Sequence, residues 1–154
     1  MSTQAFERAD RLGDLNRLRD AFRVLLTAAR SGDTSVFINL GYAYDMGRGV
    51  RKSKRKALHW YRRALAAGEG GAAHNIGTVY RDRGHPVRAA RYFREAIALG
   101  HGGSNLELGQ LLLGGLGQPT EALACFRNVG ENESETTIEA AQRLAVVAEG
   151  ALAP

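Results

Sequence analysis

The chain has 154 residues and a net charge of +5, with 44% hydrophobic and 24% charged residues, as is ordinary for a soluble globular protein. Its single cysteine, Cys125, excludes an intrachain disulfide, and no run approaches the roughly 20 apolar residues of a membrane helix. The N-terminal segment is charged where a signal peptide needs an apolar run, so we expect a cytoplasmic protein without membrane contact.

One pattern recurs four times along the chain. Each copy has an alanine, a large apolar residue four positions later and a small apolar residue after three more. The alanines are Ala21, Ala57, Ala89 and Ala122, and the large residues are Leu25, Tyr61, Phe93 and Phe126. Successive copies start 36, 32 and 33 residues apart, a spacing typical of stacked helical hairpins. We therefore predict an all-α fold, a right-handed alpha-alpha superhelix, as one solenoid domain over residues 1–154.

In chain order, the pattern predicts four copies and a terminal helix. Residues 1–32 form an incomplete copy that starts partway along its first helix, and full copies follow over 33–68, 69–100 and 101–130. Each full copy has a helix A, a turn with glycine, a helix B and a glycine C-cap. Residues 134–150 repeat small apolar residues at helical spacing, which predicts a helix that caps the last copy.

Glycine and proline mark the helices of each copy. Gly41, Gly77 and Gly109 lie inside helix A, at a cost of about 1 kcal/mol each against alanine, which indicates that another helix needs the space. Pro86 and Pro119 precede helix B, where a missing N–H costs little.

The segment Leu40–Gly68 contains a G-x-G-V loop and an A-x-x-W-Y-x-x-A helix followed by glycine, which here are Gly47, Gly49, Val50, Ala57, Trp60, Tyr61, Ala64 and Gly68. With these motifs at this spacing, the segment resembles a Sel-1-like repeat, a subclass of the tetratricopeptide repeat. The next two copies lack the loop and resemble shorter tetratricopeptide units. The resemblance implies a non-catalytic adaptor that binds a protein or peptide, and bacterial relatives also act as inhibitors or immunity-type proteins that occlude an enzyme. The abundance of Ala, Arg and Gly also favours a bacterial chain.

The same resemblance implies that helix A lines a concave groove. The residues expected to face it are Ile38, Tyr42, Asp45, Met46, His74, Thr78, Arg81, Asp82, Leu106, Gln110 and Leu113. Their mixed chemistry suits an apolar or helical segment of a partner. Packing within the superhelix is the alternative role for the apolar members.

A second candidate surface is basic, because no acidic residue occurs between Asp45 and Glu69. The predicted basic patch is Arg48, Arg51, Lys52, Lys54, Arg55, Lys56, Arg62 and Arg63. It favours an acidic peptide or protein, while ordinary solvated helix exteriors are the alternative. Since acidic residues gather near the C-terminus, copies of the chain could also meet head to tail.

Other classes of function have little support in the sequence. Direct nucleic-acid binding through residues 48–63 is a minor alternative, because the nearby aromatic residues occupy repeat positions. The four histidines lack metal-ligand spacing, and no catalytic motif occurs. We predict neither an enzyme nor a cofactor.

Overall fold

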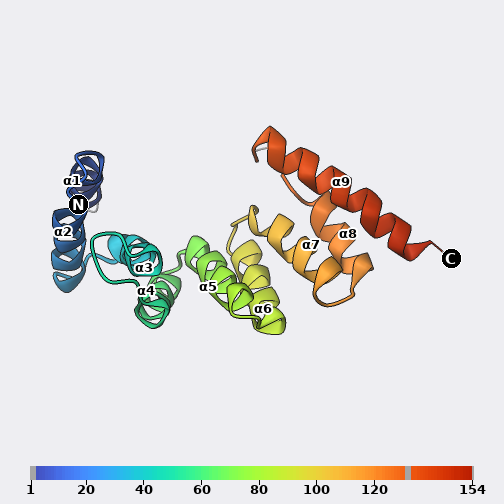
Figure 1. Cartoon of the computed structure of the whole chain (residues 1–154), viewed down its shortest axis with the longest axis horizontal. Helices are drawn as coiled ribbons and strands as arrows, with labels where there is room; N and C mark the ends of the chain where they lie inside the picture. Colours follow the sequence, from blue (N-terminus) through green and yellow to red (C-terminus); the bar gives the residue numbers. More distant parts are fainter. Residues whose placement is uncertain (1–2, 131–132, 154) are drawn as a thin grey trace. The chain divides into compact units, whose positions relative to one another are not determined.

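The computed structural model describes residues 3–130 and 133–153, and all regular secondary structure in these ranges is helical (Figure 1). The chain divides into two compact units, residues 1–72 and 73–154. The first unit contains α1 (Thr3–Asp14), α2 (Leu18–Arg30), the short 3-10 helix η1 (Thr34–Val36), α3 (Phe37–Met46) and α4 (Lys54–Ala66). The helix α5 (Gly70–Asp82) begins at the end of this unit and continues into the second. There it is followed by α6 (Pro86–Ala98), α7 (Ser104–Gly114), α8 (Pro119–Arg127) and α9 (Glu135–Leu152).

Each full copy closes around a glycine on helix A and an aromatic ring on helix B. A Cβ atom at Gly77 in α5 would lie 2.8 Å from Phe93 Cδ1 in α6, closer than carbon atoms pack. The same relation joins Gly41 to Tyr61 and Gly109 to Phe126. The rings of Tyr61 and Phe93 are fully buried. The prediction that the helix-A glycines admit a neighbouring helix is therefore confirmed.

The helix ends also follow the sequence signals. The backbone N–H of Lys56 donates to Ser53 Oγ over 3.3 Å at the start of α4, and α6 and α8 begin at proline. Gly32, Gly68 and Gly100 have φ between +87° and +91°, a conformation that glycine adopts with the least strain. These three glycines follow α2, α4 and α6, where the sequence predicts the chain to turn.

The two ends of the chain differ from the full copies. The first copy is a hairpin of two helices in which α1 has 12 residues, and its interpretation as an incomplete copy stays a prediction. The glycine that marks helix A in the full copies is replaced in α1 by Ala5, which lies 36 residues before Gly41. At the other end, α9 occupies the segment predicted as a cap, and it packs on α8 and α7 with Ala141 and Ala148 buried.

Candidate partner-binding site

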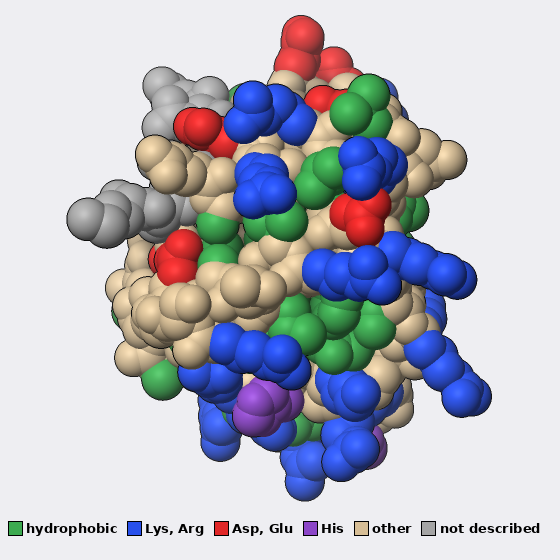
Figure 2. Space-filling view, turned by 90° about the vertical axis from the view of Figure 1, so that its left-hand side faces the viewer, with side chains coloured by type: hydrophobic (Ala, Val, Ile, Leu, Met, Phe, Trp, Pro, Cys, Tyr) green, Lys and Arg blue, Asp and Glu red, His purple; other side chains and the backbone are tan. Residues whose placement is uncertain are grey.

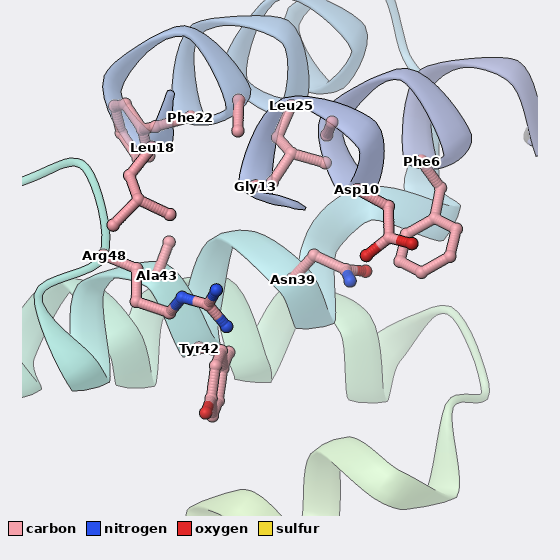
Figure 3. Close-up of a pocket in the computed structure, with 12 residues that line it drawn as sticks. Phe6, Asp10, Gly13, Leu18, Phe22, Leu25, Asn39, Tyr42, Ala43 and Arg48 are labelled. Carbon is pink, nitrogen blue, oxygen red and sulfur yellow. The ribbon is translucent and has the colours of Figure 1, made fainter. Parts of the chain in front are cut away.

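A pocket opens in the first unit where α1, α2 and α3 meet (Figure 3). Its cavity has a volume of about 110 Å³. The lining residues include apolar side chains of all three helices and three polar side chains, Asp10, Asn39 and Arg48. An apolar pocket with a few polar groups at its edge is the usual form of a binding site.

Two exposed aromatic side chains form part of the pocket wall. Phe6 on α1 is 45% exposed, and Tyr42 on α3 is 43% exposed. The sequence analysis included Tyr42 in the groove and missed Phe6. The repeat contained the signal for Phe6, since it lies 36 residues before Tyr42 and so occupies the same position of the repeat.

The pocket lies next to a repeat position that holds a smaller side chain than elsewhere. Leu25 on α2 lines it, at the position where the other three copies carry Tyr61, Phe93 and Phe126. Leucine fills less volume than an aromatic ring, and protein interiors otherwise pack with few voids. The first hairpin therefore leaves more of this space open.

The loop after α3 places Arg48 at the edge of the pocket. Gly47 ends α3 in the left-handed conformation, with φ +76°, and the Arg48 N–H donates to the Ala43 carbonyl over 2.9 Å. Gly49 also has a left-handed φ, +70°, and a Cβ there would collide with the Leu18 carbonyl of α2. The Arg48 guanidinium lies 5.9 Å from the centre of the Tyr42 ring. A residue of the predicted basic patch and a residue of the predicted groove thus meet in one pocket.

Asp45 and Lys54 require a correction of the sequence prediction. Asp45 is buried, with 8% of its surface exposed, and its carboxylate pairs with Lys54 Nζ from the start of α4. Burial, together with the negative charge of Asp45 and a hydrogen bond to it, raises the pKa of Tyr61 above its usual range. The Asp45 side chain consequently fastens α3 to α4 and is buried, whereas the sequence predicts it to face a groove. Lys54 remains 28% exposed, and its place in a partner-binding basic patch stays a prediction.

The other predicted groove residues divide between the two units. In the first unit, Met46 is exposed and Ile38 is half-buried. In the second unit, His74, Thr78, Leu106 and Leu113 are half-buried and Gln110 is exposed. Arg81 and Asp82 are exposed and pair with each other over 3.1 Å. One groove made of all these residues stays a prediction.

His74 lies in a polar cluster within the second unit. Its Nδ1 is 2.8 Å from Oγ of Ser104, which is fully buried at the start of α7, and the rings of His74 and His101 are 4.9 Å apart. Burial is the main cause that lowers the pKa of His74, and the nearby charges of His101 and Arg81 lower it further, against an opposing effect of Glu107. His74 therefore links α5 to α7 best in its neutral form.

We expect the second unit to lose stability as the pH falls through about 6.5, the usual pKa of histidine in an unfolded chain. Below that pH the unfolded state binds a proton that the folded His74 resists, so protonation favours unfolding. Thermal unfolding of the wild type and of His74→Gln between pH 7.5 and 5.5 tests this, with the exposed His59→Gln as the control. Equal pH dependence in all three proteins would contradict it.

Some cations of the predicted basic patch contact aromatic rings of the protein itself. The cations of Lys56 and Arg63 lie over aromatic rings, with Lys56 Nζ 5.2 Å from the Tyr44 centroid and Arg63 Cζ 4.3 Å from that of Phe37. Such contacts are favourable at a protein surface. Arg62 is exposed on α4. The exposed residues of the patch that form no ion pair with a described residue include Arg51, Lys52 and Arg55.

Arginines on the other helix-B exteriors pair with carboxylates. Arg94 contacts Glu121 and Arg127 contacts Glu149, each over 2.7 Å. These pairs agree with the interpretation of such residues as ordinary helix exteriors. Trp60 and Tyr61, beside the basic patch, are buried and cannot stack on nucleic-acid bases.

Two further observations concern the described part of the chain. None of its helices is both long and apolar enough to cross a membrane. Within residues 3–130 and 133–153, no cluster of three His, Cys, Asp or Glu side chains is placed to hold a metal ion. Cys125 is buried, and burial is the main cause that raises the pKa of its thiol, as expected for a packed core residue.

Successive helical hairpins with glycine–aromatic contacts define an all-α solenoid-repeat protein. More specifically, residues 38–69 and 71–101 match the family model of the Sel1 repeat, so the chain contains two Sel1 repeats. The resemblance predicted from Leu40–Gly68 is confirmed. The match over 71–101 adds a repeat that the sequence analysis compared with ordinary tetratricopeptide units.

Solved structures support the same fold. A Sel1 repeat protein from Oxalobacter formigenes is 24% identical, with a TM-score of 0.71 over 86% of this chain and 57% of its own. The protective antigen c5321 of uropathogenic Escherichia coli, which displays an SLR fold, is 15% identical, with a TM-score of 0.77 over 98% of this chain and 38% of its own. The MamA protein is 16% identical, with a TM-score of 0.65 over 98% and 86% of the two chains.

The chain thus spans less than two thirds of the length of the first two of these proteins. No curated protein matches it in sequence. Sel1 repeats generally form non-catalytic modules for protein–protein interaction.

Proposed function

We propose that this chain is a non-catalytic adaptor whose pocket between α1, α2 and α3 binds an apolar side chain of a partner protein or peptide. The observation that carries this proposal is the pair of exposed aromatic side chains, Phe6 and Tyr42, on the wall of an open pocket. Exposed aromatic residues at a pocket are typical energetic centres of protein interfaces.

The polar edge of the pocket supports a peptide as the ligand. Asp10, Asn39 and Arg48 offer hydrogen-bonding groups around an apolar interior, which suits a side chain attached to a peptide backbone. The hairpins that carry the pocket are preformed, so binding orders few groups and a small contact can give useful affinity. Three exposed cations lie near the pocket's Arg48 in sequence: Arg51 and Lys52 in the loop after α3, and Arg55 in the first turn of α4. They favour acidic residues elsewhere in the same ligand.

An adaptor and an occluding inhibitor would use the same pocket. A stoichiometric complex with an enzyme that loses its activity would identify the inhibitor, whereas a complex that joins two proteins and leaves their activities unchanged would identify the adaptor.

Peptides selected from a random displayed library should share an apolar or aromatic anchor. We expect Phe6→Ala and Tyr42→Ala each to weaken binding of a selected peptide about tenfold or more, since each removes part of the wall. Fluorescence anisotropy with labelled peptide measures this, and Val87→Ala, at an exposed position on α6, is the control.

The opposite pattern would contradict the proposal. If the peptides bind Phe6→Ala and Tyr42→Ala as tightly as the wild type but fail to bind Arg51→Glu/Lys52→Glu/Arg55→Glu, the basic patch is the site. If that binding also transfers to nucleic acid and falls steeply as salt rises, a nucleic-acid ligand replaces the peptide.

A further inference from the structure

The outer side of the α1–α2 hairpin, away from the pocket, carries apolar residues among arginines. We name it the arginine-rimmed face and define it by Arg8, Arg11, Leu12, Leu15, Arg23 and Val24. Leu15 is 68% exposed, and a shallow hollow runs between the two helices. Figure 2 views the molecule from this side and shows apolar side chains interspersed with Lys and Arg. A groove between two helices is the shape into which a further helix packs.

The arginine-rimmed face has an excess of positive charge. The hollow is lined by four arginines and one aspartate, Asp20, which pairs with Arg17 over 2.9 Å and approaches Arg23 at 3.5 Å. Arg11 donates to a backbone carbonyl, and Arg8 forms no ion pair with a described residue. An approaching partner therefore meets apolar surface edged by cations.

Helix α9, near the C-terminal end of the sequence, carries exposed apolar residues among negative charges. Ala141 and Ala148 are buried against α8 and α7, and residues two positions away point to the other side of the helix. That side, which we name the acidic valine face, carries Glu135, Glu139, Arg143, Val146 and Val147. Val146 is 68% exposed and Val147 is 57% exposed.

The acidic valine face has an excess of negative charge. It carries two glutamates, Glu135 and Glu139, and one arginine, while Glu149 on the same helix pairs with Arg127 of α8. That arginine, Arg143, lies 3.8 Å from Glu139, and both side chains are exposed. Exposed pairs of this kind contribute little, so Glu139 can exchange its partner at small cost.

We infer that this chain associates head to tail, with the acidic valine face of one copy docked on the arginine-rimmed face of the next. A single helix, α9, already lies across the α7–α8 hairpin by burying small apolar residues. The α1–α2 hairpin of a second copy offers the other side of α9 a comparable groove, with arginines where glutamates approach. The two surfaces differ, so the contact is heterologous, and each added copy leaves one free face of each kind.

Sedimentation velocity over about a thousandfold range of protein concentration tests this inference. We expect the wild type to form growing assemblies as concentration rises. Leu15→Glu should weaken association about tenfold or more by opposing the glutamates, and Val146→Arg should do so by opposing the arginines. Val87→Arg places the same charge at an exposed position of α6 and should associate like the wild type.

Mixing the two variants distinguishes a head-to-tail contact from a symmetric one. Leu15→Glu keeps its acidic valine face, and Val146→Arg keeps its arginine-rimmed face, so an equimolar mixture should form a dimer that grows no further. Circular dichroism verifies that each variant is folded. If Leu15→Glu unfolds the chain, Arg23→Glu serves instead, because that side chain is 78% exposed.

Several results would overturn the inference. A wild type that stays monomeric at all concentrations would do so, as would assemblies that tolerate both substitutions. A dimer of the wild type that the variant mixture fails to restore would instead indicate a symmetric interface. None of these results bears on peptide binding in the pocket, because Phe6 and Tyr42 belong to neither face.

Discussion

Replacing Gly109 by alanine is expected to lower the free energy of unfolding of the second unit by about 3 kcal/mol. A Cβ atom there would lie 2.7 Å from Phe126 Cδ1, so either the ring or α7 must move. Phe126 is buried and its neighbours fill the surrounding space, which leaves no inexpensive adjustment. Urea denaturation followed by circular dichroism measures the loss.

Gly114→Ala in the same helix is the matched control. Gly114 is the last residue of α7 and no atom lies within 4 Å of a Cβ at that position, so the substitution causes no collision and should change stability by no more than about 0.5 kcal/mol. Adding Phe126→Leu to Gly109→Ala should recover part of the loss, because leucine occupies less of the contested space. Equal effects of the two alanine substitutions would show that the glycine–aromatic contact is not what constrains position 109.

Lys54→Met should destabilise the first unit by about 2 kcal/mol, since it leaves the Asp45 carboxylate buried without its counter-ion. The value is below that for a fully buried pair because 28% of the Lys54 side chain and 11% of the Asp45 side chain remain exposed. The hydroxyl of Tyr61 continues to interact with Asp45, which limits the loss further. Urea denaturation at neutral pH measures the effect.

Lys52→Met, two residues earlier, removes an exposed lysine and should change stability by no more than about 0.5 kcal/mol. The double variant Asp45→Asn/Lys54→Met removes both charges and should be more stable than Lys54→Met alone. If Lys54→Met and Lys52→Met behave alike, the ion pair contributes nothing beyond an ordinary surface lysine.

The repeat made much of the fold predictable. The close packing of two helices explains the alanines at a fixed period, the large apolar residue four positions later and the glycine in helix A. These signals predict that a helix packs against each glycine, and the structure shows that the partner of Gly77 is Phe93. Pro86 and Pro119 located two helix starts by local chemistry alone.

The candidate site was less predictable, because it depends on departures from the repeat. Asp45 occupies a helix-A position that the family resemblance places in a groove, yet the loop of this copy brings Lys54 against it and buries it. Phe6 was detectable only by its spacing from Tyr42, since α1 has Ala5 at the position of the glycine that marks helix A in the other copies. The contact between Arg48 and Tyr42 depends on how the loop folds back, which residue spacing does not encode.

The glycine–aromatic contacts also bear on how the chain folds. Gly41 and Tyr61 are 20 residues apart, Gly77 and Phe93 are 16 apart, and Gly109 and Phe126 are 17 apart, so each contact closes a short loop. Closing short loops costs little chain entropy, and proteins rich in such local contacts fold quickly. Single hairpins are therefore the natural sites of nucleation, and folding can spread from any of them to its neighbours during synthesis.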